Sequence, residues 1–344
     1  MAEKQTYTIA VTSNRYDLEW EARELAALDD LDVELRTGVC PTEDALIALA
    51  RDADAVLISS REPITRRIVE NLPRCKVITR HAVGIDHIDL DAAAEHGIVV
   101  THVPDYCTAE VADHTLALIL ALNRRILAFD QDLRRGAWIE HRHLMDRILR
   151  GPIPPLREQT LGLVGIGRIG SAVAERAQPF GLTVIAADPY VEPAVVRERG
   201  AEPVALDELL TQADIVSLHC YLSPETRGLI GEREFGLMKP TAVLVNTARG
   251  PIVDIPAVTR ALQERRIAGA ALDVVDPEPL PADSPLYHLD NVILTPHAAY
   301  YSERSIELVR SEALKETLRV LRGQRPRTVA NPAVLNRVEL APLA

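Results

Sequence analysis

The ten residues Leu161-Gly162-Leu163-Val164-Gly165-Ile166-Gly167-Arg168-Ile169-Gly170 decide the fold of this chain. The first four end a predicted apolar strand, and the last six have the spacing GxGxxG where a helix begins. In such a turn the first glycine permits the tight bend, the second lets the backbone approach a pyrophosphate, and the third lets the helix pack closely on the strand. The alternative is that the glycines only close a strand–helix turn. The predicted dinucleotide contacts are Gly165, Gly167, Arg168, Ile169 and Gly170.

Asp188 is the second cofactor signal, 18 residues beyond Gly170 and just past the predicted strand Thr183–Ala187. An acid at this place accepts hydrogen bonds from the adenosine ribose hydroxyls and repels a 2′-phosphate. Pro189 and Tyr190 follow, and no arginine is near in the sequence to receive that phosphate. We therefore expect NAD to be preferred over NADP. A capping or turn acid is the alternative for Asp188.

Short apolar strands alternate with amphipathic helices on both sides of this turn, which is typical of parallel sheets covered by helices on both faces. A predicted long helix from Thr108 and a last helix from Ser302 bracket a nucleotide domain. The predicted fold is α/β, with two Rossmann-like domains of parallel, doubly wound sheet. The NAD-binding domain, 108–301, is inserted into a flavodoxin-like substrate domain, 1–107 with 302–331, and 332–344 is a tail. We expect the ligand to lie between the two domains.

Composition limits the kind of partner. The 344 residues carry a net charge of −12, which argues against nucleic acid or an anionic membrane because both need a basic face. The four cysteines lack metal-ligand spacing, so we predict no metal and isolated thiols in a reducing compartment. The longest apolar stretch, 116–122, is far below the roughly 20 residues of a membrane span, and the N-terminus has no apolar signal core. We expect a cytoplasmic protein.

Three residues at predicted strand ends suit the reduction of a 2-keto acid, which needs a cation for the carboxylate and carbonyl and a tuned proton donor. Arg249 lies in Asn246-Thr247-Ala248-Arg249-Gly250, directly after an apolar strand. Its guanidinium is a planar fork of donors that matches a carboxylate. The small neighbours favour a ligand close to the backbone, and the alternative is a surface arginine.

His297 and Glu278 are the predicted acid–base pair. His297 follows the predicted strand Val292–Thr295, and histidine titrates near neutrality. Glu278 stands between Pro277 and Pro279, so its backbone is restricted, and a carboxylate beside the imidazole would stabilise the imidazolium. A structural histidine and a plain loop acid are the alternatives. Asp276 is a rival for the role of Glu278, although it lies nearer the strand.

The motifs GIGRIG, NTARG, LDVVDPEP and TPHAA, in this order, resemble those of the D-isomer-specific 2-hydroxyacid dehydrogenases over about Thr8 to Asn331. The resemblance implies hydride transfer between the nicotinamide of NAD and C2 of a small 2-hydroxy or 2-keto acid. It implies Arg249, Glu278 and His297 as the catalytic set, and a homodimer formed through residues 108–155. It also implies four further NAD contacts, which are Thr226, Thr247, Ala248 and Asp273.

The segment Arg80-His81-Ala82-Val83-Gly84-Ile85-Asp86-His87-Ile88-Asp89 resembles the substrate loop of that family. The resemblance implies that the backbone of Ala82, Val83 and Gly84 holds the substrate carboxylate and that Arg80 reaches the substrate. Ala82 replaces a usual glycine and His87 a usual asparagine, which puts the identity of the substrate in doubt.

Within the family, the segments around Tyr106, His219 and Tyr300 are most similar to the C-terminal binding protein group. Tyr300 stands where the animal members have tryptophan, so it either lines the substrate pocket or packs between the domains. The same resemblance keeps a second function open, an NAD-gated scaffold or corepressor without metabolic turnover. A basic cluster within 134–150 is either a solvated or interface patch or a positive rim that steers an anionic substrate. Its members are Arg134, Arg135, His141, Arg142, His143, Arg147 and Arg150.

Overall fold

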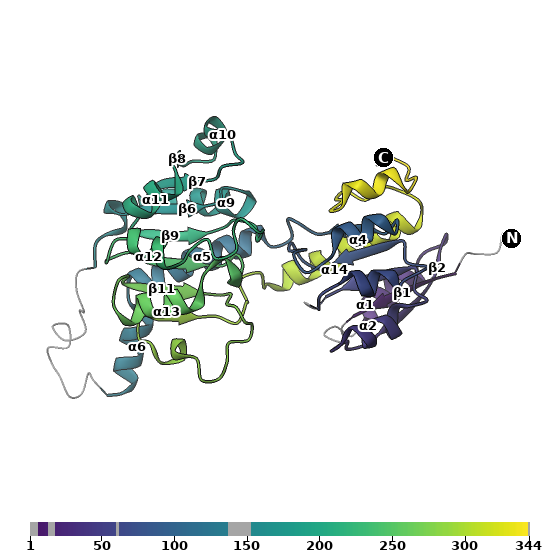
Figure 1. The fold of residues 1–344 in the computed structure, drawn as a ribbon, viewed down its shortest axis with the longest axis horizontal. Helices are drawn as coiled ribbons and strands as arrows, with labels where there is room; N and C mark the ends of the chain where they lie inside the picture. The colour runs from purple at the N-terminus through teal and green to yellow at the C-terminus, as the bar shows by residue number, and fades with distance from the viewer. Residues whose placement is uncertain (1–5, 13–17, 60–61, 137–152, 343–344) are drawn as a thin grey trace. The chain divides into compact units, whose positions relative to one another are not determined.

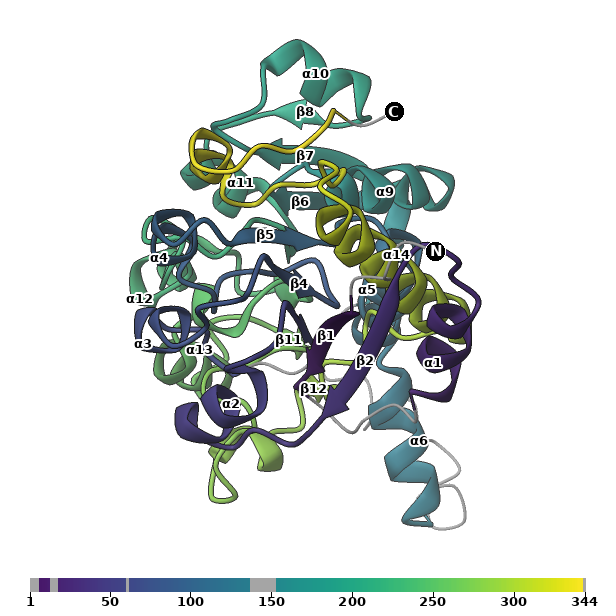
Figure 2. The ribbon, with the colours of Figure 1, turned by 90° about the vertical axis from the view of Figure 1, so that its right-hand side faces the viewer.

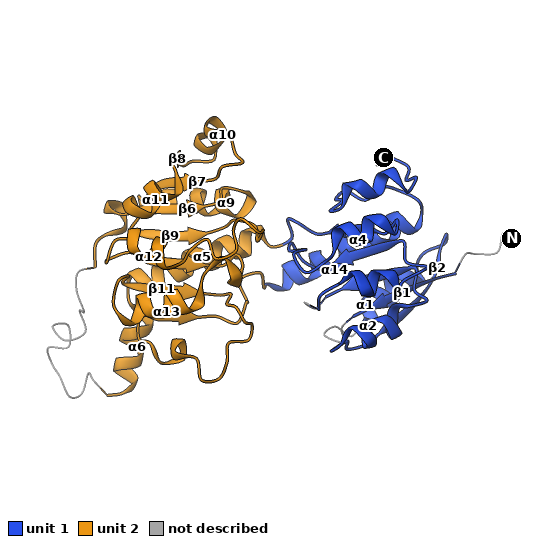
Figure 3. Ribbon diagram, viewed as in Figure 1, with its two compact units in different colours: residues 1–106, 302–344 blue, residues 107–301 orange. Residues whose placement is uncertain are grey.

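Each half of the predicted architecture is built on one parallel sheet. The computed structural model describes residues 6–12, 18–59, 62–136 and 153–342. By its internal contacts the chain divides into two units, Met1–Tyr106 with Ser302–Ala344 (unit 1) and Cys107–Tyr301 (unit 2), coloured separately in Figure 3. The two parallel-sheet α/β units confirm the predicted fold class. Most of the basic cluster, from His141 to Arg150, lies outside the described residues.

Unit 1 holds a five-stranded sheet of order β2-β1-β3-β4-β5, in which all neighbouring strands are parallel. Its strands are β1 (Thr6–Val11), β2 (Asp32–Thr37), β3 (Ala55–Ile58), β4 (Val77–Arg80) and β5 (Val99–His102). Its helices are α1 (Glu19–Ala26), α2 (Glu43–Ala50), α3 (Arg66–Glu70), α4 (Leu90–Glu95) and α14 (Glu303–Leu321).

Helices cover both faces of this sheet (Figure 2). On one face α2, α3 and α4 bury Leu46, Ile68 and Ala92 against the strands. On the other face α14 packs on β3, β4 and β5. Thr42 and Asp89 cap α2 and α4 by accepting hydrogen bonds from backbone N–H groups, which explains why these short helices begin where they do.

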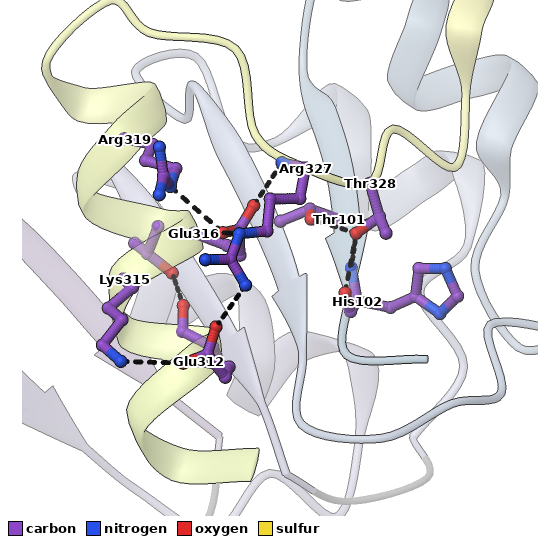
Figure 4. Close-up of polar contacts among 10 residues, drawn as sticks. Thr101, His102, Glu312, Lys315, Glu316, Arg319, Arg327 and Thr328 are labelled. Atoms are coloured by element: carbon purple, nitrogen blue, oxygen red, sulfur yellow. Dashed lines mark hydrogen bonds and ion pairs between the residues drawn. The ribbon is translucent and has the colours of Figure 1, made fainter. Parts of the chain in front are cut away.

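The chain that leaves α14 returns to the edge strand β5 (Figure 4). The buried carboxylate of Glu316 accepts a hydrogen bond from the Arg327 backbone N–H at 2.5 Å. Thr328 Oγ1 then donates to the His102 carbonyl at 2.7 Å, and the Asn331 side chain bonds the β5 backbone. The residues after Asn331, expected to form a tail, include the 3-10 helix Pro332–Asn336, in which Val334 is buried.

Unit 2 holds a seven-stranded parallel sheet of order β12-β11-β10-β9-β6-β7-β8 (Figure 1). The order reverses between β6 and β9, which is the switch point where open α/β sheets bind ligands at the carboxyl ends of their strands. The strands are β6 (Thr160–Val164), β7 (Thr183–Ala187), β8 (Glu202–Pro203), β9 (Ile215–Leu218), β10 (Val243–Asn246), β11 (Gly269–Leu272) and β12 (Val292–Leu294).

Two apolar cores lie on the two faces of this sheet. One contains Ile119 and Val173 from α5 and α9, and the other contains Leu209, Phe235 and Val258 from α11, α12 and α13. The helices are α5 (Thr108–Asn123), α6 (Ile126–Arg134), α9 (Arg168–Ala177), α10 (Pro193–Glu198), α11 (Leu206–Gln212), α12 (Glu232–Leu237) and α13 (Ile255–Gln263).

Candidate active site

The glycine turn joins β6 to α9 with the geometry that a dinucleotide requires. Gly165 has φ +93°, and a Cβ there would lie 2.7 Å from the backbone nitrogen of Cys220. A Cβ on Gly170 would collide with the carbonyl oxygen of Gly165, whereas one on Gly167, the residue before α9, would meet nothing within 4 Å. The turn is therefore closely packed at Gly165 and Gly170 and open at Gly167, directly before the N-terminus of α9. This arrangement fits a bound pyrophosphate.

Asp188 lies at the carboxyl end of β7, beside this turn. Its Oδ2 accepts a hydrogen bond from the Ile166 N–H at 3.0 Å, and its Oδ1 accepts one from the Tyr190 N–H at 3.1 Å. The carboxylate is half-buried. Asp188 lies beside the turn because β6 and β7 are paired neighbours in the sheet, and its contact with the adenosine ribose stays a prediction.

The loop after β10 is held by its own asparagine. The side chain of Asn246 accepts a hydrogen bond from the Ala248 N–H at 3.0 Å and donates to the Arg249 carbonyl at 2.9 Å. Thr247 Oγ1 lies 2.9 Å from Thr115 Oγ1 of α5, which ties the loop to the helix. Gly250 packs so closely on the Val275 backbone that no Cβ would fit. Arg249 is therefore carried on a rigid loop.

Asp273 organises the loop that carries His297. Its Oδ1 accepts hydrogen bonds from Thr295 Oγ1 at 2.6 Å and from the Ala298 N–H at 2.9 Å, and its Oδ2 accepts one from the Ala299 N–H at 3.0 Å. Its carbonyl accepts a further bond from the His297 N–H at 2.8 Å. Asp273 is buried, so these bonds satisfy a carboxylate that would otherwise be costly to bury.

His297 and Glu278 meet in this structure. The imidazole Nδ1 of His297 lies 3.2 Å and 3.3 Å from the two carboxylate oxygens of Glu278, and both side chains keep partial exposure to solvent. The backbone of His297 is left-handed, with φ +51°, a conformation that is strained for this residue type and that the Asp273 bonds hold. The rival Asp276 instead lies 4.0 Å from the guanidinium of Arg227.

His114 is a neighbour of this loop that sequence reasoning missed. Its Nε2 lies 3.2 Å from Thr295 Oγ1 and 3.8 Å from Asp273 Oδ1. No local pattern in α5 marks it, because its partners lie more than 150 residues away along the chain. The sequence indicated the motif that contains Thr295, but it did not indicate that His114 contacts this threonine.

Known proteins are similar to this chain in sequence and in fold. Residues 116–299 match the family described as D-isomer specific 2-hydroxyacid dehydrogenase, NAD binding domain. The chain is 39% identical over 295 residues to the glyoxylate reductase of Korarchaeum cryptofilum, an alignment that covers 86% of this chain and 88% of that protein. This chain belongs to the D-isomer specific 2-hydroxyacid dehydrogenase family. Family membership confirms the predicted assignment to NAD-dependent oxidoreductases that act on a CH–OH group.

Two further proteins are similar to this 2-hydroxyacid dehydrogenase in sequence or in fold. It is 40% identical over 301 residues to the D-3-phosphoglycerate dehydrogenase of Methanocaldococcus jannaschii, covering 87% of this chain but only 55% of that longer protein. The D-lactate dehydrogenase of Aquifex aeolicus, complexed with NAD and lactic acid, superposes with a TM-score of 0.77 at 29% identity, covering 98% of this chain and 100% of that one. The narrower resemblance to the C-terminal binding protein group stays a prediction.

The remaining candidates of unit 2 lie on loops of the dehydrogenase sheet. Thr226 Oγ1 donates to the Tyr221 carbonyl at 2.6 Å and accepts from the Ser223 N–H at 2.7 Å, so it shapes the turn after β9. The ring of Tyr300 lies edge-on to that of His297, with 6.3 Å between the ring centroids. Tyr300 is thus a direct neighbour of the candidate acid–base pair.

The substrate-loop candidates of the dehydrogenase belong to unit 1. Arg80, the last residue of β4, is only 6% exposed and donates from Nη1 to the Ile58 carbonyl at 3.1 Å. The Val83 carbonyl lies 2.7 Å from His102 Nδ1, and the Ala82 carbonyl accepts a hydrogen bond from the Val103 N–H at 3.3 Å. The loop through Gly84 is therefore fixed on the end of β5.

Among the described residues, no helix is both long enough and apolar enough to span a membrane. Across those same ranges, no group of three or more histidine, cysteine or acidic side chains is arranged to hold a metal ion.

Proposed function

We propose that this dehydrogenase interconverts small 2-keto acids and D-2-hydroxy acids, with Arg249, Glu278 and His297 as its catalytic residues. The observation that carries the proposal is the His297–Glu278 contact at 3.2 Å, on a loop that Asp273 holds in a strained conformation. A strained backbone conformation persists only where several surrounding contacts hold it in place, and such conformations are common at functional sites.

Three neighbouring strands support a common site for these residues. β10, β11 and β12 pair in register and run in parallel, so their carboxyl ends lie at one edge of the sheet. Arg249 follows β10, Glu278 follows β11 and His297 follows β12. A substrate at this edge would face a guanidinium and an imidazole carried by the same rigid sheet.

Each side chain has a distinct part in the reaction. The guanidinium of Arg249 binds the carboxylate of the substrate and polarises its C2 carbonyl. In the direction of reduction, His297 donates a proton to the carbonyl oxygen, and in oxidation it accepts the proton of the hydroxyl. Glu278 orients the imidazole through Nδ1 and stabilises its charged form, leaving Nε2 for the substrate.

The cofactor site of the proposal comprises the glycine turn, Asp188, and the loops that contain Thr226, Thr247, Ala248 and Asp273. NAD supplies or accepts the hydride when it is bound. Asp273 already has both carboxylate oxygens bonded within its own unit. We therefore assign Asp273 to holding the His297 loop in addition to any contact with the nicotinamide amide.

The substrate class is tested by NADH oxidation with glyoxylate, hydroxypyruvate, pyruvate and a branched 2-keto acid. We expect turnover of at least one of them and a loss of turnover in His297→Asn. His288→Asn, at an exposed histidine of the same unit, is the matched control and should behave like the parent protein. Tight NADH binding without turnover of any of the four acids would overturn the proposal.

We also propose a homodimer formed through residues 108–155. The described part of this segment supports it, because α6 buries none of its residues and exposes the apolar side chains of Ile126, Leu127 and Leu133. Light scattering should report a dimer, and Ile126→Glu with Leu127→Glu should dissociate it. Val39→Glu, at an exposed apolar residue of unit 1, is the control. A monomeric parent protein would contradict the proposal.

The cytoplasmic location stays a prediction.

A further inference from the structure

Arg199 reaches the glycine turn from the segment that connects β7 to β8. It follows α10, and its Nη1 donates to the carbonyl oxygen of Ile166 at 2.6 Å. Ser171 Oγ of α9 donates to the same oxygen at 3.1 Å. Ile166 is the residue between the first two glycines of the turn, so the guanidinium lies against the segment that the dinucleotide would contact.

Asp188 holds the other end of the same residue. Its carboxylate accepts the Ile166 N–H at 3.0 Å, while Arg199 donates to the Ile166 carbonyl. Ile166 is therefore bonded by an acid through its N–H and by a base through its carbonyl. Arg199 lies 11 residues after Asp188, beyond the neighbours Pro189 and Tyr190 on which the expected preference for NAD was based.

The charge of Arg199 is not neutralised by a carboxylate within the described part of the chain, and its side chain is exposed. Two other arginines of unit 2 differ in this respect. Arg197, two residues earlier, pairs with Glu202 at 3.1 Å, and Arg176 of α9 pairs with Asp113 at 2.6 Å. In a chain of net charge −12, an exposed guanidinium beside the turn is a local source of positive potential.

We propose that Arg199 is a specificity residue for the cofactor. It places a positive charge on the adenosine side of the site, which offsets the repulsion between Asp188 and a 2′-phosphate. The protein then binds NADP(H) measurably as well as NAD(H), and with less discrimination than Asp188 alone would impose. The guanidinium offers five donors, of which the Ile166 carbonyl uses one, so donors remain for a phosphate.

The test compares the dissociation constants of NADH and NADPH, measured by fluorescence at low salt without any keto acid. We expect Arg199→Gln and Arg199→Leu to weaken NADPH binding about three- to fivefold more than NADH binding, as for the loss of one exposed charge. Arg199→Lys keeps the charge and should keep the parent ratio. Added salt should reduce the difference between the parent protein and Arg199→Gln.

Arg197→Gln is the matched control, because it removes a charge from the same segment that is already paired with Glu202. Its ratio of affinities should match that of the parent protein. Three results would overturn the proposal: no measurable NADPH binding by the parent, an equal loss of both cofactors in the Arg199 variants, or the same shift in Arg197→Gln. The readout does not depend on the keto acid, so it stands apart from a failure of the proposed reaction.

Discussion

The carboxylate of Glu278 lies 3.2 Å from the imidazole of His297, although the two residues follow different strands. Glu278 comes after β11 and His297 after β12, and the pairing of Leu272 with Leu294 sets these strand ends side by side. An ionised carboxylate in this position is a charged hydrogen-bond partner for the imidazole Nδ1. A substitution of Glu278 should therefore change the activity that depends on His297.

Glu278→Gln removes the charge and keeps the shape of the side chain. We expect kcat/KM for keto-acid reduction to fall by about tenfold or more, because the imidazolium loses its counter-charge. NADH affinity should stay within about twofold of the parent value. Asp276→Asn is the control, since that carboxylate faces Arg227 instead. Equal effects of the two variants would contradict the assignment of Glu278.

Arg249→Lys tests the need for a planar fork of donors. A lysine keeps the charge but binds a carboxylate as a point charge, so we expect kcat/KM to fall by about 10²–10³, comparable with the loss of an oxyanion donor. Arg265→Lys, at an arginine paired with Asp290 on the same unit, should leave the kinetics unchanged. Near-parent kcat/KM in Arg249→Lys would remove Arg249 from the catalytic set.

Thr295→Val deletes the hydroxyl that bonds Asp273 at 2.6 Å and contacts His114 at 3.2 Å. We expect unfolding to become easier by about 1 kcal/mol and kcat/KM to fall by about tenfold, because the His297 loop loses one of its restraints. Thr259→Val removes a comparable hydroxyl bond within α13. It should reduce stability to a similar extent and leave kcat/KM unchanged. A matched loss of activity in both variants would show that only stability is involved.

Tyr300→Ala should change the order in which keto acids are preferred. The ring lies edge-on to His297, so an alanine there enlarges the space beside the acid–base pair. We expect relative kcat/KM to rise for branched keto acids against glyoxylate. Tyr301→Ala removes a neighbouring ring that is 57% exposed, and it serves as the control. Unchanged relative kcat/KM values in Tyr300→Ala would exclude it from substrate selection.

Two histidines, the buried His81 and the half-buried His219, make stability depend on pH. Burial lowers the pKa of His81 and of His219 to about 4, from an ordinary value of 6.5. Between these values the unfolded chain binds protons that the folded chain does not, so the free energy of unfolding falls as pH falls from 6.5 towards 4. Across this window each group lowers the free energy of unfolding by about 3 kcal/mol.

Thermal unfolding at about pH 7.5 and about pH 5 measures this contribution. The drop in Tm between the two should shrink in His219→Gln and in His81→Gln. It should persist in His288→Gln, whose histidine is exposed. If the drop in Tm in His81→Gln and in His219→Gln is as large as in the parent protein, other groups cause the pH dependence.

The sequence by itself determined the features that depend on neighbours along the chain. The spacing of the glycines from Gly165 to Gly170 predicts a dinucleotide-binding turn. Asp188 follows the next strand at the distance that is typical of the ribose-binding acid in such folds. Arg249 and His297 were predicted from their places after apolar strands, and Glu278 from the prolines on both sides of it. Strand alternation was sufficient to predict two parallel sheets.

Only the tertiary structure decided which of these side chains meet. Strand order and register bring Glu278, not Asp276, to His297, and they bring His114 to Thr295 and Arg199 to Ile166. The structure also decides the surroundings of Arg80, which is buried and donates to the Ile58 carbonyl. Its contact with the substrate stays a prediction. Local patterns record backbone preference and burial, whereas contacts between distant segments follow from how the strands pair and the helices pack.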